Sequence, residues 1–335
     1  MKAAPGEFRR AAFVAGARLE GVLRAGGLAL PVALDPAVVR VEALGVGESY
    51  AAWLASDGRG SLVFRLPVRP VDELPRGMAG ELRAAPLIPA GVGSVPLAVD
   101  EASDNALGHP YLVSSHVAGR HVPAGEWDDA LLARHAGQLA RLHRRRFPVE
   151  DVDRLDLVAE FDAGAEWWAA HHPEVGDTPE ARRLAGEIHR RLDDVAGEFE
   201  AITYAFVHAD LVATNVVVGD DGVPRFIDWE WSRIGDVAND LAMIGGTIMG
   251  GRWYVPMDDA AIDRFIRAYV EESRSLGSPP EDPAGLRARR DAWELHERFQ
   301  NSLHCDARSR EEGADPSYAR ATAQLRHGLR QRLSL

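Results

Sequence analysis

Short apolar and aromatic runs, separated by turn-forming residues, dominate the first 120 positions of the chain. The runs with the composition of β-strands are 39–44, 50–54, 61–66 and 110–116. Glycine-rich turns at 45–47 and 56–60 separate the first three runs. The segments 7–24 and 77–85 have helical spacing instead. This pattern predicts a small β-rich lobe with two short helices.

From Asp128 onward, apolar residues recur every three or four positions, as in an amphipathic helix. The first such series is Leu131, Leu132, His135, Leu139 and Leu142. Further helical patterns cover 161–171, 179–199, 258–274 and 286–303. A second β-rich island at 204–228 interrupts these helices. The pattern therefore predicts a larger, mainly helical lobe with a hairpin embedded in it.

Together the two regions predict an α+β fold built from two lobes. Residues 1–118 form the N-terminal lobe, which includes an N-terminal helix. A hinge is expected at 114–119, and residues 119–335 form the C-terminal lobe. The length of 335 residues allows each lobe a core of its own.

Composition and charge exclude several classes of function. The formal net charge is −13, whereas a protein that binds the nucleic-acid backbone should be basic. Cys305 is the single cysteine, so neither an intrachain disulfide nor a cysteine-rich zinc site is expected. No uninterrupted apolar run is long enough to span a membrane. We therefore expect a cytoplasmic protein without nucleic-acid or membrane partners, and a monomer, since no long apolar stripe is left unexplained.

The charge is unevenly distributed along the chain. Residues 1–150 carry a net charge of +1, and residues 151–335 carry −14. Scattered acids most often serve solubility. The alternative is that the C-terminal part receives a cationic ligand. Lys2 is the only lysine, so a buried cation elsewhere must be an arginine.

The most informative motif is His208-x-Asp210-Leu211-x-x-x-Asn215. It has the spacing of the kinase catalytic loop H-x-D-L-x-x-x-N. The strand-like residues that follow enclose a Gly-Asp-Asp-Gly turn, which predicts a hairpin. Such a hairpin brings Asn215 and Asp228 to its open end, where amide and carboxylate oxygens suit Mg²⁺. The alternative is a buried hairpin whose polar residues only satisfy turns and caps.

The segments HADLVATN and IDWEWSRIGDVANDLA resemble the catalytic loop and metal-binding segment of the aminoglycoside phosphotransferase and choline kinase group. These small-molecule kinases share the protein-kinase fold. LARLHR at 139–144 and PYLVSSHVAG at 110–119 are similar to the first large-lobe helix and the hinge of that group. The resemblance covers most of residues 39–245. It implies an enzyme that transfers a phosphoryl group from ATP or GTP to the hydroxyl of a small molecule, with Mg²⁺.

The resemblance also implies roles for individual residues. Asp210 is the expected catalytic base, and His208 is expected to orient the loop rather than to transfer protons. Asn215 and Asp228 are expected to hold Mg²⁺. The positions expected to contact the nucleotide are Gly45, Gly47 and Ser49 over the phosphates and the backbone of Ser115 and Val117 at the base.

One position departs from the protein-kinase pattern. The strand LVFRLP offers Arg65 where protein kinases have a phosphate-binding lysine. Its expected partner is Glu81, with Glu73 as the second choice. Arginine is not equivalent to lysine here, because its planar fork approaches phosphate differently. The alternative is that Arg65 is a surface residue of the strand, which would keep open a pseudokinase that binds nucleotide without transfer.

The acceptor is expected to bind in the acidic C-terminal lobe. Candidate ligands for a cationic acceptor are Glu230, Asp291 and Glu294. Paired tryptophans at 167–168, and Trp229 with Trp231, could stack on an amine or a large ring, although packing is the commoner role of tryptophan. A cationic antibiotic such as an aminoglycoside fits best. A macrolide, or a metabolic acceptor such as choline, homoserine or a sugar, is the alternative.

Overall fold

The computed structural model describes residues 5–200, 202–279 and 281–335. Its contacts divide the chain into two compact units. The first unit comprises the residues up to Ala118 together with Arg225–Ser232. The second unit comprises Gly119–Pro224 and Arg233–Leu335. The sequence placed everything beyond residue 118 in one lobe, whereas these contacts group Arg225–Ser232 with the first unit.

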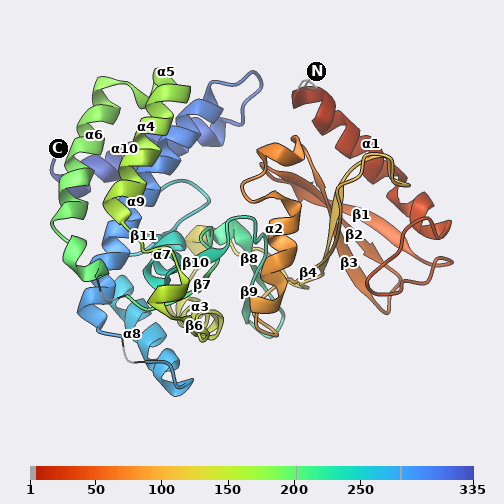
Figure 1. Cartoon of the computed structure of the whole chain (residues 1–335), viewed down its shortest axis with the longest axis horizontal. Coiled ribbons are helices and arrows are strands. Elements are labelled where there is room, and N and C mark those ends of the chain that lie inside the picture. Colours follow the sequence, from red (N-terminus) through yellow and green to blue (C-terminus); the bar gives the residue numbers. More distant parts are fainter. Residues whose placement is uncertain (1–4, 201, 280) are drawn as a thin grey trace. The chain divides into compact units, whose positions relative to one another are not determined.

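The first unit is built around one antiparallel sheet with the strand order β1-β2-β3-β5-β4. Figure 1 labels β1 to β4 of this sheet. Its elements are α1 (Pro5–Arg24), β1 (Arg40–Val46), β2 (Tyr50–Ser56), β3 (Ser61–Pro67), η1 (Val71–Glu73), α2 (Gly77–Ala84), η2 (Ala85–Leu87), β4 (Pro96–Asp100) and β5 (Tyr111–Ser115). The predicted helices and strands of this lobe are all present. Strand β4 was not predicted, because only two of its five residues have the bulk typical of strands.

The alternation of side chains along β2 and β3 explains how the two faces of the sheet are covered. Trp53 and Phe64 pack toward α1, where they form one core with Leu19 and other apolar residues. A methyl group at Gly16 of α1 would collide with the Trp53 ring, so helix and sheet approach closely at this glycine. The other face bears Tyr50, which packs in a second cluster with α2.

The second unit is mainly helical, with short strands between its helices. Its helices are α3 (Asp129–Leu142), α4 (Leu157–His171), α5 (Pro173–Gly176), α6 (Pro179–Asp193), α7 (Val237–Met243), α8 (Asp259–Ser275), α9 (Pro283–Ser309) and α10 (Pro316–Leu333), with 3₁₀ turns η3 (Ala124–Glu126), η4 (Val149–Asp151), η5 (Ala196–Phe199) and η6 (Ala213–Asn215). Its strands are β6 (Arg146–Phe147), β7 (Tyr204–Val207), β8 (Val216–Val218), β10 (Arg233–Asp236), β11 (Gly245–Gly246) and β12 (Val255–Pro256), while β9 (Pro224–Phe226) continues into the first unit. Helix α9 is central, because α4, α6, α7, α8 and α10 all pack against it (Figure 1).

Helix ends follow the capping residues in the sequence. Asp128 caps α3 and Asp258 caps α8 through side-chain bonds to the third residue that follows. Helix α6 ends at Asp193, earlier than the predicted 199, and the residues that follow form the separate turn η5. The predicted turn in the hairpin is present, since the Gly219 N–H donates to the Val223 carbonyl at 3.2 Å.

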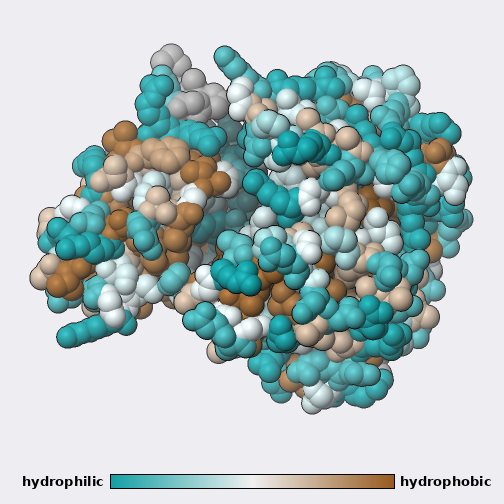
Figure 2. Space-filling model, turned by 180° about the vertical axis from the view of Figure 1, so that it is seen from behind, coloured by the Kyte–Doolittle hydropathy of each residue, from teal (hydrophilic) through white to brown (hydrophobic). Residues whose placement is uncertain are grey.

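Large apolar side chains are exposed mainly on the first unit. The exposed ones among the described residues are Phe13, Val14, Val32, Val38, Leu44, Val46, Trp167 and Trp231. All but Trp167 belong to the first unit, on which Figure 2 shows several hydrophobic areas. No helix in the described part of the chain is both long and apolar enough to cross a bilayer.

Candidate active site

The His208–Asn215 loop follows directly after strand β7 in the second unit. His208 is fully buried, and Asp210 is half-buried at the start of the loop. Ala209 between them has a φ of 63°, which is strained for a residue other than glycine. Such strain persists where surrounding contacts enforce it, and it is concentrated at functional sites.

Asp240 of α7 holds this strained loop in place. Its Oδ2 accepts the backbone N–H of His208 at 2.8 Å, and its Oδ1 accepts that of Ala209 at 2.7 Å. Burial raises the pKa of Asp240, but the hydrogen bond and charge of His143 outweigh burial and leave that pKa below its usual value. Two charge-assisted bonds therefore fix the backbone before Asp210.

His143 completes the support behind Asp240. Its Nε2 lies 3.0 Å from Asp240 Oδ2, and its Nδ1 lies 3.1 Å from the Tyr269 hydroxyl. Burial lowers the pKa of His143, in spite of the neighbouring carboxylate. A neutral imidazole that donates from Nε2 to an ionised Asp240 agrees with the lowered pKa of both groups.

Asp210 and Asn215 are joined within the loop. The Asn215 side-chain amide donates to the backbone carbonyl and to Oδ2 of Asp210, both at 2.8 Å. The amide nitrogen is therefore engaged, and the remaining acceptor of Asn215 is its Oδ1. The second unit thus brings together three of the predicted residues, His208, Asp210 and Asn215.

Arg65 is buried in the first unit rather than exposed on its strand. It lies on the face of β3 that carries α2, and it forms ion pairs with Glu81 of α2 and with Asp228. The Tyr50 ring covers the guanidinium, with the carbon 4.1 Å from the ring centroid. Burial acts to lower the pKa of Arg65, but Asp228 and Glu81 outweigh it and raise that pKa. Arg65 is therefore a fixed cation between two carboxylates.

Backbone contacts explain why Asp228 lies beside β3 although it is far away in sequence. The Phe226 N–H donates to the Val92 carbonyl at 2.9 Å, and the Ser94 N–H donates to the Phe226 carbonyl at 2.8 Å. The Trp229 indole donates to the Ser94 carbonyl at 2.7 Å. Asp228 itself has a φ of 70°, again in the left-handed region. Trp229, which follows the predicted metal ligand, therefore anchors the segment in the first unit.

Three carboxylates meet at Arg65. Oxygens of Glu81, Asp228 and Glu230 lie within 4.8 Å of one another. Burial, followed by the charge of Asp228, raises the pKa of Glu230 well above its usual value, although the charge of Arg65 and, more weakly, a hydrogen bond with Ser49 act to lower it. Glu230 was predicted as an acceptor ligand of the helical lobe. The structure places it in the first unit, beside the end of the glycine-rich turn.

The remaining candidates for nucleotide contacts lie at two places, near the end of β1 and at the end of β5. Gly45 is exposed near the end of β1, and Gly47 is exposed in the turn that follows, where its N–H donates to the Tyr50 carbonyl at 2.8 Å. The Ser115 N–H donates to the Val95 carbonyl at 2.9 Å, so this donor is not free for a nucleotide base. Val117 is half-buried in the segment that follows.

The two acidic candidates of α9 have structural partners. Glu294 is buried, pairs with Arg290, and accepts the Ile248 N–H at 3.0 Å. Asp291 pairs with Arg287 at 2.8 Å and with Arg332 at 2.9 Å. Both carboxylates are therefore engaged in holding α9 to its neighbours.

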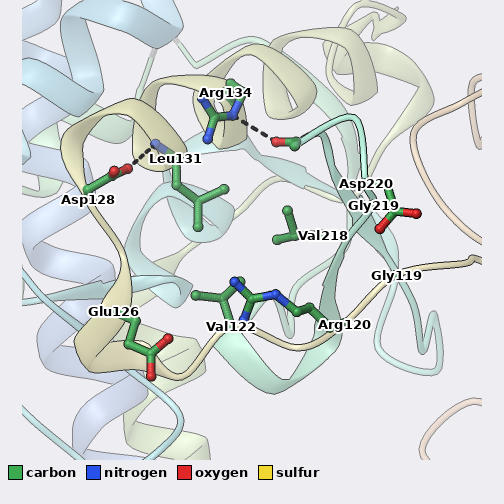
Figure 3. Close-up of a pocket in the computed structure, with 11 residues that line it drawn as sticks. Gly119, Arg120, Val122, Glu126, Asp128, Leu131, Arg134, Val218, Gly219 and Asp220 are labelled. Atoms are coloured by element: carbon green, nitrogen blue, oxygen red, sulfur yellow. Dashed lines mark hydrogen bonds between the residues drawn. The ribbon is translucent and has the colours of Figure 1, made fainter.

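A pocket of about 580 Å³ opens on the second unit between α3 and the hairpin turn (Figure 3). Arg134 of α3 donates to the Gly222 carbonyl at 2.7 Å across it. Arg120 points into the pocket from the opposite wall (Figure 3). None of the residues with a predicted catalytic role lines this pocket.

The first unit thus holds a cluster of charged groups around Arg65, and the second unit holds the His208–Asn215 loop. The model of the phosphotransferase enzyme family matches residues 40–308. The chain belongs to this family. Its protein-kinase-like fold and its activity as a phosphotransferase are therefore as the sequence predicted. Helices α1 and α10 lie outside the matched range.

Solved structures of other small-molecule kinases share the fold of this phosphotransferase. An ethanolamine kinase from Plasmodium vivax has a TM-score of 0.65 at 12% identity, over 96% of this chain and 88% of that one. A choline kinase from Cryptosporidium parvum Iowa II has a TM-score of 0.63 at 14% identity, over 95% of each chain. A macrolide 2′-phosphotransferase from Brachybacterium faecium has a TM-score of 0.59 at 20% identity, over 93% and 98%. No curated protein sequence matches the chain.

Two contributors to the site of this phosphotransferase were not predicted. Tyr50 looked like an ordinary strand residue, and only the fold shows that it covers Arg65. His143 lies in the segment LARLHR, which carried part of the family resemblance but no assigned role. Asp240 lies in the segment that resembles the family's metal-binding segment, and its contacts with His208 and Ala209 show that it braces the loop.

Proposed function

We propose that the chain transfers the γ-phosphoryl group of ATP or GTP to a hydroxyl group of a small molecule, with Mg²⁺. The observation that carries this proposal is the pairing of Arg65 with both Glu81 and Asp228. It supports a phosphate-binding role for the residue that departs from the kinase pattern. A surface arginine would need no carboxylate on either side.

Asp210 is the proposed base, which accepts the proton of the acceptor hydroxyl. The oxygen of that hydroxyl attacks the γ-phosphorus while the bond from the γ-phosphorus to the bridging oxygen breaks, and the nucleoside diphosphate leaves with that oxygen. Its hydrogen bond from Asn215 and the bracing of the preceding backbone by Asp240 support a fixed orientation. His208 is proposed to position this loop through its buried backbone and ring. Gly45, Gly47 and Ser49 are proposed to cover the phosphates, and Ser115 and Val117 to meet the base through their backbone.

Mg²⁺ is proposed to bind to Asn215 and Asp228. Both side chains can supply an oxygen, the ligand atom that this ion prefers. Glu81 Oε1 and Glu230 Oε2 are buried and have no hydrogen-bond partner among the described residues, which supports a cation beside Asp228. When bound, the ion neutralises charge on the β- and γ-phosphates.

The acceptor is proposed to be cationic, with an antibiotic such as an aminoglycoside as first choice. The net charge of −14 over residues 151–335 supports this choice. One of the similar solved structures is a complex with gentamicin. A macrolide kinase or a metabolic kinase acting on choline, homoserine or a sugar is the alternative, and the similar macrolide, choline and ethanolamine enzymes support it. We place the protein in the cytoplasm, where nucleoside triphosphates are available, and as a monomer.

The test is acceptor-dependent release of ADP or GDP in the presence of Mg²⁺. The panel contains aminoglycosides, macrolides, choline, homoserine and sugar alcohols, and Asp210→Asn serves as the blank. Release that a cationic antibiotic stimulates and that the variant lacks supports the first choice. Release that only a metabolite stimulates supports the phosphotransferase activity but contradicts the choice of an antibiotic as acceptor. Nucleotide binding without release on any acceptor moves the protein to the pseudokinase alternative.

A further inference from the structure

One buried arginine of α9 contacts the segments that support the catalytic loop. Arg298 is fully buried in the second unit. Its Nη2 donates to the Ala242 carbonyl at 2.9 Å, and its Nε donates to the Ile248 carbonyl at 3.3 Å. The guanidinium carbon lies 3.4 Å from the centroid of the Tyr254 ring. Arg298 therefore makes three contacts with the segment that runs from α7 to β12.

The charge of Arg298 is not neutralised by an ion pair. Its partners among the described residues are two carbonyls and one ring, and none is a carboxylate. Arg290, two turns earlier on α9, differs because it pairs with Glu294. Burial lowers the pKa of Arg298, although Tyr254 and Glu294 act to raise it. A buried charge costs free energy that an apolar side chain of similar volume would avoid, so packing alone does not explain this arginine.

The first contact fixes the end of α7. Ala242 lies in the last turn of this helix, where backbone carbonyls have no partner within the helix. Asp240 lies two residues earlier, and its carboxylate accepts the N–H groups of His208 and Ala209. The position of Asp240 thus depends on the anchorage that Arg298 gives to α7.

The second contact holds the start of the loop between β11 and β12. The Ile248 carbonyl accepts from Arg298, and the Ile248 N–H donates to Glu294 at 3.0 Å. Ile248 is itself buried. Helix α9 therefore engages both polar backbone groups of this residue.

The third contact holds the end of the same loop. The Tyr254 ring lies over the guanidinium, and its hydroxyl accepts the side-chain amide of Asn301, also of α9. The carbonyl of the preceding residue, Trp253, accepts the Ala213 N–H at 2.8 Å. Ala213 belongs to the catalytic loop. A second series of contacts thus leads from α9 to that loop.

We propose that Arg298 is a positioning residue for phosphoryl transfer, which fixes the backbone on both sides of Asp210. It acts through α7 on His208 and Ala209, and through the loop before β12 on Ala213. This inference rests on the proposed function, in which Asp210 is the base. A misplacement of about 1 Å at such a group can slow a reaction on the order of 100-fold.

Amide hydrogen exchange tests the position of the loop without any acceptor. The full chain is compared by mass spectrometry as wild type, Arg298→Met and Arg298→Lys. In Arg298→Met, the amides of residues 208–213 should exchange at least about tenfold faster, because their supports are released. Arg298→Lys keeps a charged donor without the planar fork and should lie between the two. The amides of α6, another helix that packs on α9, should keep their rates.

Turnover tests the consequence for the reaction. Release of nucleoside diphosphate from ATP or GTP is measured with Mg²⁺ and gentamicin or choline, and with water alone. In Arg298→Met, kcat should fall at least about tenfold while the KM for the nucleotide stays unchanged, because Arg298 contacts no residue proposed to bind nucleotide. Arg298→Lys should recover part of kcat. If Arg298→Met does not fold, Arg298→Lys serves for both measurements, with smaller effects in the same direction.

Arg326→Met is the matched control. Arg326 is a half-buried arginine of α10, and its ion pairs are with Asp306 of α9 and Glu180 of α6. Its removal should affect thermal stability, yet the exchange of residues 208–213 and kcat should remain those of the wild type.

Three results overturn the inference. The first is wild-type exchange of residues 208–213 in the Arg298 variants. The second is an equal acceleration in α6, which makes Arg298 purely structural, and the third is faster loop exchange with an unchanged kcat. Failure of the inference alone is recognised by turnover that Asp210→Asn abolishes and the Arg298 variants leave intact. Turnover that persists in Asp210→Asn, or no release with any of these acceptors, removes the proposed function and this inference with it.

Discussion

Arg65 makes two kinds of contact, ion pairs with carboxylates and a contact with an aromatic ring, that a lysine could not make with the same geometry. Its fork reaches Glu81 and Asp228 at the same time, and its flat face lies under Tyr50. A lysine is a single point charge without a planar face. The position of the cation in the first unit thus depends on the shape of the side chain as well as on its charge.

The first prediction concerns this shape. Arg65→Met should raise the KM for the nucleotide at least about tenfold, because hydrogen bonds to charged groups are worth about 1.5–3 kcal/mol. Arg65→Lys should lie between this variant and the wild type. Steady-state kinetics with varied nucleotide measure the effect. Arg69→Met, at a half-buried arginine near the end of the same strand, should behave as wild type, and an Arg65→Met enzyme with unchanged KM would contradict the assignment.

Asp240 acts on the reaction through the backbone of the catalytic loop. Asp240→Asn removes the charge that accepts the N–H groups of His208 and Ala209. We expect kcat to fall by about 10- to 100-fold with the nucleotide KM nearly unchanged, since charge-assisted bonds are lost far from the nucleotide. Asp194→Asn, at an exposed site of the same unit, is the control. A loss confined to thermal stability, with kcat intact, would make Asp240 purely structural.

At the scale of elements, a buried histidine of α3 makes the stability of the protein depend on pH. His135 of α3 is fully buried between Trp127 and Phe265, with ring centroids at 5.4 and 6.0 Å. Burial lowers its pKa to about 3, from an ordinary value of 6.5. Between pH 6.5 and about 3, His135 is therefore mostly protonated in the unfolded chain but mostly neutral in the folded protein.

The sign of the resulting pH dependence follows from linkage. Because the folded pKa is depressed, the stabilisation is complete above pH 6.5 and is lost as pH falls toward 3. Between pH 7.5 and 5.5, His135 alone should cost about 1.4 kcal/mol of unfolding free energy. Urea unfolding at both pH values measures it. His135→Phe should lose less stability over this interval than the wild type, while His327→Phe, at an exposed histidine, should lose as much.

Gly93 decides whether Arg225–Ser232 can dock on the first unit. A methyl group at this position would collide with the Phe226 carbonyl oxygen. Gly93→Ala should therefore displace Asp228 and lower kcat/KM for the nucleotide by tenfold or more, about the effect of one misplaced catalytic group. Gly125→Ala, where the added methyl meets open space, should have no effect. Full activity in Gly93→Ala would show that the segment docks in another way.

The sequence predicted most helices and strands, because hydrophobic spacing and aspartate caps act locally. Asp210, Asn215 and Asp228 stay predictions as site residues, and they could be named from the sequence because their spacing along the chain is itself the signal. The position of Asp228 beside β3 depends on backbone hydrogen bonds between Phe226 and both Val92 and Ser94. No residue pattern in these segments predicts those bonds. The position of Glu230 and the engagement of Asp291 and Glu294 could not be predicted for the same reason: partners distant in sequence decide whether an acid is free.

For the whole molecule, the uneven distribution of charge leads to a prediction about substrate capture. Residues 151–335 carry a net charge of −14, whereas residues 1–150 are nearly neutral. A cationic acceptor should be attracted to the acidic part, and salt should weaken this attraction.

The corresponding prediction compares two acceptors in salt. Raising KCl from about 0.05 to 0.5 M shortens the screening length roughly threefold, so kcat/KM for a cationic acceptor should fall several-fold. A neutral acceptor with measurable turnover, such as a sugar alcohol, should change little. Parallel behaviour of both acceptors would mean that the acids serve solubility alone.

The chain passes between the two units at residues 118–119, 224–225 and 232–233. A gene fragment that ends at Ala118 would therefore encode a sheet with Arg65 and Glu81 but without the octapeptide Arg225–Ser232 that supplies Asp228 and Glu230. Such a fragment should recover its missing carboxylates from the synthetic octapeptide in trans. Swapping this octapeptide between relatives would then exchange the two carboxylates beside Arg65 without changing the rest of the first unit.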